Sequence, residues 1–202
     1  MLVSADWSGV RNLLCVRLDG LGDVLMTTPA IRAFRHSLPG CRITLLASPA
    51  GAAAARFIPE IDEVIEFEAP WMKATAGRPT RDLSLAADRV GFDAAAIFTV
   101  YSQSPLPAAY LCYLAGIPLR LAHCRENPYQ LLTSWVPDPE PESKIRHEVR
   151  RQLDLAAAVG CRTLDTRLSF SVRPSALATV SGLLREAGDA RPLIVVHPGA
   201  SA

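Results

Sequence analysis

The sequence has little of what marks a secreted or a nucleic-acid-binding chain. Its 202 residues carry 21 Lys and Arg against 20 Asp and Glu, and this balance excludes a domain that recruits nucleic acid by bulk charge. The five cysteines are scattered and form no C-x-x-C pair, which is typical of reduced thiols in a cytoplasmic protein rather than of a disulfide framework. The first residues also lack the basic start and the apolar run of a signal peptide.

No apolar run is long enough to span a bilayer. The most apolar stretch, residues 105–119, is interrupted by two tyrosines, a glycine and a proline, so we predict a buried helix there. Half of the residues are nevertheless hydrophobic and only 20% are charged, which excludes disorder as the main state and supplies a sizeable core. The mean hydropathy of +0.18 leaves a peripheral membrane role open.

Short apolar runs alternate with segments of helical spacing along most of the chain. The predicted strands are residues 13–18, 43–47, 64–67, 94–100 and 119–121, and the predicted helices are 24–36, 51–57, 81–90, 105–116 and 149–157. Near-continuous apolar strands separated by helices indicate an α/β, Rossmann-like fold, in which helices cover both faces of a doubly wound parallel sheet. In such folds the functional crevice lies at the carboxyl ends of the strands.

A second unit is predicted to begin near residue 173. Pro174 suits the first turn of a helix, and a buried-type strand at 193–196 follows shortly before the sequence stops. A lone parallel strand cannot satisfy its own backbone donors and acceptors. We therefore expect residues 1–165 to form one domain and residues 173–202 to be the start of a second Rossmann-like domain, so that the chain is a fragment.

The most informative segment is the turn after the first strand, residues 19–23, with the sequence Asp-Gly-Leu-Gly-Asp. Two glycines allow a sharp turn that approaches a ligand closely. A dinucleotide-binding turn would need a small residue in place of Leu25 and an acid near Ser48, at the end of the second strand. The charge of Asp23 would also repel a pyrophosphate. We therefore reject a nicotinamide or flavin site here.

Two roles fit Asp23. Aspartate is a preferred cap at a helix N-terminus, and it can also act as a general base that accepts a proton from a substrate hydroxyl. Pro29 follows one to two turns later and is predicted to bend or restart the helix. Asp23 is then either a structural cap or a catalytic carboxylate facing the crevice.

The run from Leu14 to Ala30 closely resembles the opening of the family-nine glycosyltransferases, the lipopolysaccharide heptosyltransferases. The resemblance continues through residues 115–120, 147–151 and 197–201, and it spans the chain but only about the first half of such an enzyme. It implies a GT-B architecture of two facing Rossmann-like domains. It further implies inverting transfer of heptose from an ADP-activated donor to a lipid-linked lipopolysaccharide core acceptor, without a metal or other cofactor, in the cytoplasm at the face of the inner membrane.

The resemblance also assigns roles to residues. Asp23 would be the base, and Gly20 and Gly22 would shape the turn that presents it. Further candidates for the acceptor side are Asp19, Tyr101, Ser102, Gln103, Arg120 and His147. The loop that meets the donor diphosphate would begin with Gly199, Ala200 and Ser201, because backbone N–H groups and a hydroxyl suit phosphate oxygens.

Some of these candidates also have a purely structural interpretation. Tyr101, Ser102 and Gln103 follow the fourth strand and are expected in the same crevice as Asp23, but they also fit a plain loop. His147 belongs to a predicted basic helix face with Arg146, Arg150 and Arg151. That face either contacts a phosphate or is simply solvated.

A loop and two other classes of protein complete the predictions. Trp71 and Lys73 lie in a loop that either touches a lipid or a partner domain or lets the Trp fold back onto the core. Zinc-type spacing and a G-x-S-x-G elbow are absent from the sequence. The alternatives to an enzyme are a non-catalytic, degenerate sugar-binding module and a flavodoxin-like nucleotide binder, and the charge of Asp23 disfavours the latter.

Overall fold

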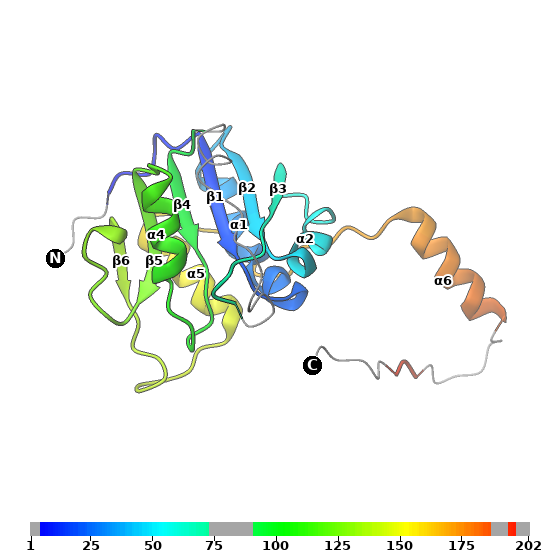
Figure 1. Ribbon diagram of the computed structural model, residues 1–202. Coiled ribbons are helices and arrows are strands. Elements are labelled where there is room, and N and C mark those ends of the chain that lie inside the picture. The colour runs from blue at the N-terminus through cyan, green and yellow to red at the C-terminus, as the bar shows by residue number, and fades with distance from the viewer. Residues whose placement is uncertain (1–4, 73–90, 187–193, 197–202) are drawn as a thin grey trace. The chain divides into compact units, whose positions relative to one another are not determined.

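Six parallel strands form the centre of the first unit of the chain (Figure 1). The computed structural model describes residues 5–72, 91–186 and 194–196, and the chain divides into units of residues 1–170 and 171–202. The described strands are β1 (Asn12–Arg17), β2 (Arg42–Ala47), β3 (Glu63–Glu66), β4 (Ala94–Ile97), β5 (Leu119–Cys124) and β6 (Ser134–Pro137), in the order β3-β2-β1-β4-β5-β6. The predicted parallel α/β sheet is confirmed.

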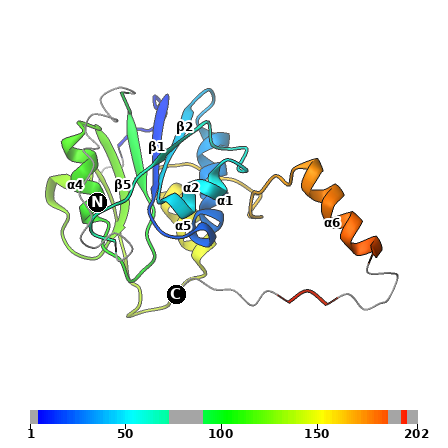
Figure 2. The same ribbon diagram turned by 45° about the vertical axis from the view of Figure 1, so that its right-hand side comes forward.

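Helices cover both faces of this sheet (Figure 2). They are α1 (Leu21–Ser37), α2 (Pro49–Ala55), α4 (Leu106–Leu114) and α5 (Glu148–Ala158), with a short 3₁₀ turn at Tyr129–Leu131. Side chains alternate along each strand: in β1, Leu13 and Cys15 pack with α1, α2 and α5, whereas Leu14 and Val16 pack with α4. The sheet is therefore buried on two sides, as its continuous apolar strands predict.

Helix α4 differs from its prediction. It was expected to be buried, but only one side of it is: Ala108, Ala109 and Cys112 lie in the core, while Tyr110 and Tyr113 are about half exposed. The helix covers one face of the sheet. Its sequence has no charged residue that would mark the exposed side, so one-sided burial was not predicted.

Helix α1 continues without interruption through Pro29. A proline has no N–H for the carbonyl four residues earlier, which here belongs to Leu25. The hydroxyl of Thr28 donates to that carbonyl at 2.7 Å, and the hydroxyl of Thr27 donates to the carbonyl of Asp23 at 2.8 Å. Since the freed carbonyl has a partner, the predicted restart of the helix does not occur.

The last strand, β6, was not predicted. It ends at Pro137 and pairs with β5 alone, as Leu121 with Ser134 and Cys124 with Pro137. A strand at the edge of a sheet tolerates a proline, because only one of its sides must supply ladder hydrogen bonds.

The second unit contains α6 (Pro174–Glu186), close to the predicted helix. Its apolar residues Leu177, Val180, Leu183 and Leu184 are all exposed. The described residues 194–196 form no strand, although one was expected there. The predicted helix at 81–90 lies outside the described residues.

Gly51 lets α2 approach the start of α1, and this generates a stability prediction. A Cβ atom on Gly51 would lie 2.8 Å from Cγ2 of Val24 and 3.2 Å from Cβ of Ala47. We expect Gly51→Ala to lower the free energy of unfolding by about 1–3 kcal/mol through overpacking, measured by urea denaturation. Gly22→Ala is the matched control, because its Cβ would meet nothing within 4 Å, and it should be neutral or stabilising. Equal effects of the two substitutions would contradict this account.

Candidate active site

The candidate site is built around Arg17, the last residue of β1, whose side chain is fully buried. Its guanidinium is surrounded by three carboxylates. Nε lies 2.9 Å from Oδ2 of Asp19, Nη2 lies 3.2 Å from Oδ1 of Asp23, and Nη1 lies 2.9 Å from Oε1 of Glu148. One strand and the first turns of two helices thus meet at a single buried cation. Neither Arg17 nor Glu148 was predicted, because Arg17 stands inside an apolar strand sequence.

Asp23 sits in the first turn of α1, at its third residue. The N–H of Gly20, the residue that caps the helix, donates to Oδ2 of Asp23 at 3.1 Å. This is the reciprocal contact of a capping box. The N-cap residue is Gly20 and not Asp23, so the interpretation of Asp23 as the cap itself is wrong, although its side chain does bond to the cap residue. The other oxygen, Oδ1, faces Arg17, and the side chain stays 30% exposed. A partly exposed carboxylate with both oxygens fixed is also suited to accept a proton.

Asp19 joins the turn to the neighbouring strands. The side-chain amide of Gln103, after β4, donates to Oδ1 of Asp19 at 2.5 Å. The hydroxyl of Ser48, after β2, donates to the backbone carbonyl of Asp19 at 2.6 Å. Burial raises the pKa of the Asp19 carboxyl, although the charge of Arg17 and the hydrogen bond from Gln103 act in the opposite direction.

Glu148 is the first residue of α5, where a helix terminus favours a negative charge. Its Oε1 accepts a hydrogen bond from the amide of Gln152 at 2.7 Å as well as from Arg17. The same Gln152 amide donates to the carbonyl of Thr99, beyond β4, at 3.0 Å. The beginning of α5 is therefore tied to the carboxyl edge of the sheet.

Arg151 provides a second buried cation one turn further along α5. Its guanidinium lies 2.8 Å from both carboxylate oxygens of Asp138 and also pairs with Glu140, while its Nε donates to the carbonyl of Thr99 at 3.1 Å. Arg146 adds an ion pair with Glu140 at 2.9 Å. Burial is possible because the two acids neutralise the guanidinium.

This corrects the predicted basic face of α5. The buried residues of the helix are Arg151, Gln152, Leu155 and Ala156, whereas Val149 and Leu153 are only partly buried. Arg146 and Arg151 form ion pairs with Asp138 and Glu140. They therefore do not present a solvated or phosphate-binding surface.

The structure brings some of the predicted acceptor residues together. Asp19, Gly20, Asp23 and Gln103 are linked by the contacts described above, and Gly22 lies in the first turn of α1. Tyr101 and Ser102 precede Gln103 in the turn after β4; Tyr101 is half-buried and Ser102 is exposed.

His147 and Arg120 stand apart from this group. His147 caps α5 and is exposed next to Glu148. Arg120 lies near the amino end of β5, at the opposite edge of the sheet, where its guanidinium donates to the carbonyls of Leu131 and Gln130, each at 2.8 Å. A guanidinium used in this way braces a loop, and the structure does not bring Arg120 to the group around Asp23.

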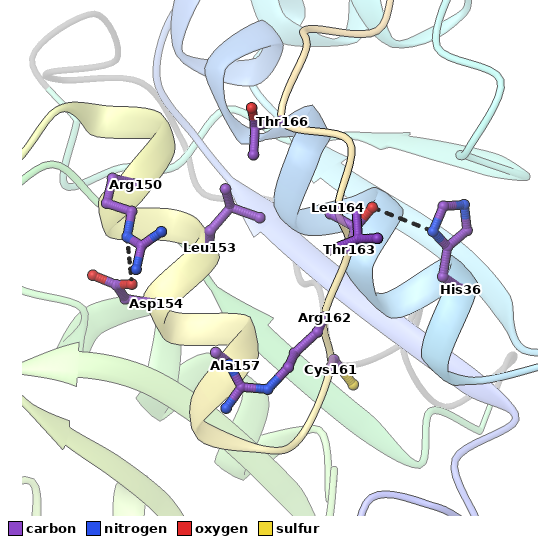
Figure 3. A pocket seen from close by; sticks show the side chains of 10 residues that line it. All are labelled: His36, Arg150, Leu153, Asp154, Ala157, Cys161, Arg162, Thr163, Leu164 and Thr166. Carbon is purple, nitrogen blue, oxygen red and sulfur yellow. Dashed lines mark hydrogen bonds and ion pairs between the residues drawn. The ribbon is translucent and has the colours of Figure 1, made fainter.

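Two hollows of the first unit are lined by residues of α1, of α5 and of the segment 161–168, on the face of the sheet that α1 and α5 cover. The first has a volume of about 440 Å³, and its lining includes His36, Leu153 and Arg162 (Figure 3). The second has a volume of about 610 Å³ and includes His147 and Met26. Asp23 is not among the lining residues of either hollow. They are separate features from the carboxylate cluster at the carboxyl edge.

The remaining expectations concern Trp71, the cysteines and metals. The ring of Trp71 packs against Phe67 at 5.9 Å between centroids, yet 39% of the residue is exposed; Lys73 and Gly199–Ser201 lie outside the described residues. All five cysteines are buried free thiols.

Within the described part of the chain, no cluster of His, Cys, Asp and Glu side chains could hold a metal ion. No described helix has the length and apolarity to cross a bilayer.

The fold of the chain was compared with known proteins. No protein-family model and no curated protein matches the chain. Among solved structures, a family 9 glycosyltransferase of Veillonella parvula matches with a TM-score of 0.63 at 18% identity, over 93% of this chain and 51% of that one. The ADP-heptose lipopolysaccharide heptosyltransferase II of E. coli matches with a TM-score of 0.63 at 20% identity, over 86% and 50%.

A third solved structure agrees with these two. The E. coli heptosyltransferase WaaC with ADP matches with a TM-score of 0.55 at 20% identity, over 78% of this chain and 50% of that one. The chain thus has the Rossmann-like fold found in glycosyltransferases of this kind, and it spans about half the length of the solved structures it matches.

His123 generates a prediction about pH and stability. Burial lowers its pKa to about 4, whereas an unfolded chain protonates histidine near pH 6.5. The stability that this histidine contributes is complete above about pH 6.5 and falls as the pH drops toward 4, by about 1.4 kcal/mol per pH unit. We expect urea unfolding of the wild type to lose about 2 kcal/mol more between pH 7 and pH 5 than unfolding of His123→Leu does. The exposed-residue control His36→Gln should keep the wild-type dependence, and equal slopes in all three proteins would contradict the prediction.

Proposed function

We propose that the chain is the acceptor-binding half of an inverting glycosyltransferase of the heptosyltransferase type, with Asp23 as the catalytic base. The observation that carries the proposal is the Asp23 carboxylate, which is fixed by Arg17 and Gly20 at the carboxyl edge of the sheet and is still 30% exposed. The edge of a parallel sheet where strands end is the usual position of a site in this fold. The similarity in fold to heptosyltransferases supports the same conclusion.

The proposed reaction needs one base and a departing diphosphate. Asp23 accepts the proton of an acceptor hydroxyl while that oxygen forms a bond to the anomeric carbon of the donor sugar. The bond between that carbon and the diphosphate oxygen breaks at the same time, and its electron pair leaves with the diphosphate. Attack from the face opposite to the leaving group inverts the anomeric centre.

The substrates follow from the same proposal. Gln103, Asp19 and Ser102 offer polar groups that suit sugar hydroxyls near Asp23, and the acceptor would be a lipid-linked lipopolysaccharide core. The donor would be ADP-heptose, as the solved relative with bound ADP suggests. Its site would involve Gly199, Ala200 and Ser201 in a domain that begins near residue 173, and the enzyme would work at the cytoplasmic face of the inner membrane.

The first test is Asp23→Asn in the two-domain enzyme that carries this chain as its acceptor half. The amide keeps the shape and an oxygen for Gly20 but cannot accept the proton, so we expect kcat to fall by about 10²- to 10⁴-fold with little change in KM. Circular dichroism should show an intact fold. Asp6→Asn, at an exposed acid in the N-terminal turn, is the matched control and should retain full turnover. Unchanged turnover of Asp23→Asn would remove this residue from the mechanism.

The second test uses the 202-residue chain itself. Asp19 and Asp23 place negative charge where a pyrophosphate would approach, and like charges repel. We expect isothermal titration to detect binding of a core oligosaccharide but to find ADP binding weaker than a Kd of about 1 mM. Tight ADP binding would contradict the acceptor-half assignment. Binding of the oligosaccharide, together with no detectable transfer by the wild-type two-domain protein, would instead favour a sugar-binding module.

A further inference from the structure

Among the described residues, the Asp23 carboxylate has one contact within its own helix turn and one with a residue of another element. The N–H of Gly20 is only three residues away and fixes Oδ2 within the same helix turn. The contact of Oδ1 with Nη2 of Arg17 instead joins α1 to the end of β1. The direction of the Asp23 carboxylate therefore depends on where the Arg17 guanidinium is held.

The guanidinium is planar, so fixing one of its ends fixes the other. Nη1 donates to Oε1 of Glu148 at 2.9 Å, and Nη2 donates to Asp23 from the other arm of the fork. Glu148 is fixed in turn by the amide of Gln152, which also donates to the carbonyl of Thr99. The chain of contacts runs from the sheet edge through α5 and Arg17 to Asp23.

Electrostatics makes this anchoring necessary. Asp19, Asp23 and Glu148 bring three carboxylates around one cation, and at such distances like charges repel one another appreciably. A guanidinium that shifted toward Asp19 alone would leave Asp23 free to turn away toward water. Glu148 prevents this shift because it binds the arm of the fork next to Nη2.

We infer that Arg17 and Glu148 are positioning residues of the transfer reaction, which hold the Asp23 carboxylate in the direction needed to accept the hydroxyl proton. The inference rests on the proposed function, and it adds α5 to the elements that determine the rate. Neither residue exchanges a proton with the substrate. Their contribution is the orientation of Asp23, and small errors in the placement of a reacting group are costly.

The kinetic test compares two substitutions of Glu148 in the two-domain enzyme. Glu148→Ala removes the acceptor of Nη1, and we expect kcat to fall by about 10- to 100-fold while KM stays within about threefold. Glu148→Gln keeps an oxygen at the same position and should restore kcat to within about fivefold of the wild type. Arg150→Gln, an exposed position on the same helix, is the matched control and should leave kcat unchanged.

An NMR experiment on the 202-residue chain tests how the Arg17 guanidinium is held, without the need for turnover. A guanidinium held on three carboxylates rotates slowly about its C–N bonds, so the Arg17 Nη hydrogens should give separate NMR signals in the wild type and in Glu148→Gln. We expect these signals to merge in Glu148→Ala, while the backbone amide signals of β2 remain in place and exclude general unfolding.

The outcomes separate this inference from the proposed function. If Asp23→Asn is inactive but Glu148→Ala keeps the wild-type kcat, the positioning role is overturned and the proposed function stands. A loss of kcat that Glu148→Gln does not restore, or a rise in KM alone, would also overturn it. If Asp23→Asn is fully active, the proposed role of Asp23 as the base fails, and the positioning role fails with it.

Discussion

The arrangement of the turns and helix ends at the carboxyl edge of the sheet depends on the burial of Arg17. A guanidinium removed from water is strongly destabilising unless it is paired, and here three carboxylates from three segments of the chain converge on it. Such a cluster adds little net stability compared with an apolar core. Its effect is geometric, because the glycine turn, the start of α1 and the start of α5 must all take positions that satisfy one planar cation. The direction of Asp23 is a consequence of that requirement.

Arg151, one turn further along α5, is a second arginine that is buried because carboxylates neutralise it. Arg151 is buried with Asp138 and Glu140 and donates to the carbonyl of Thr99, so the proline-containing segment after β6 is fastened to α5 and to the end of β4. Arg17 and Arg151 are thus joined through Thr99, Gln152 and Glu148. The apolar residues of the strands determine the sheet, and this polar network determines which loops surround its edge. Rigid support of this kind is what a reacting side chain requires.

The elements of the fold could be predicted because each carries a local signal, whereas the network could not. The continuous apolar strands and the glycine turn indicate a parallel sheet with a crevice, and Gly160, at a φ of 84°, follows the end of α5 in the left-handed conformation that glycine favours. The strand β6 was missed because Pro137 argues against a strand unless the strand lies at an edge. Arg17 and Arg151 were missed or misplaced because the burial of an arginine depends on acids that other elements of the fold bring to it. Glu148 lies 131 residues from Arg17, and no local pattern shows such a pair.

The charge of the site fits the proposed function, in which this turn of a Rossmann-like fold would meet an acceptor rather than a nucleotide. The turn after the first strand of a Rossmann-like sheet usually binds phosphate through backbone N–H groups at a helix terminus. Here the N–H of Gly20 already donates a hydrogen bond to the Asp23 carboxylate, and Asp19 adds a second carboxylate to the turn. An anionic diphosphate would meet repulsion and an N–H group that is already bonded, whereas a neutral hydroxyl would meet an acceptor for its proton. Chemistry between a hydroxyl and a nucleotide sugar then requires the phosphates to be bound by other groups than this turn.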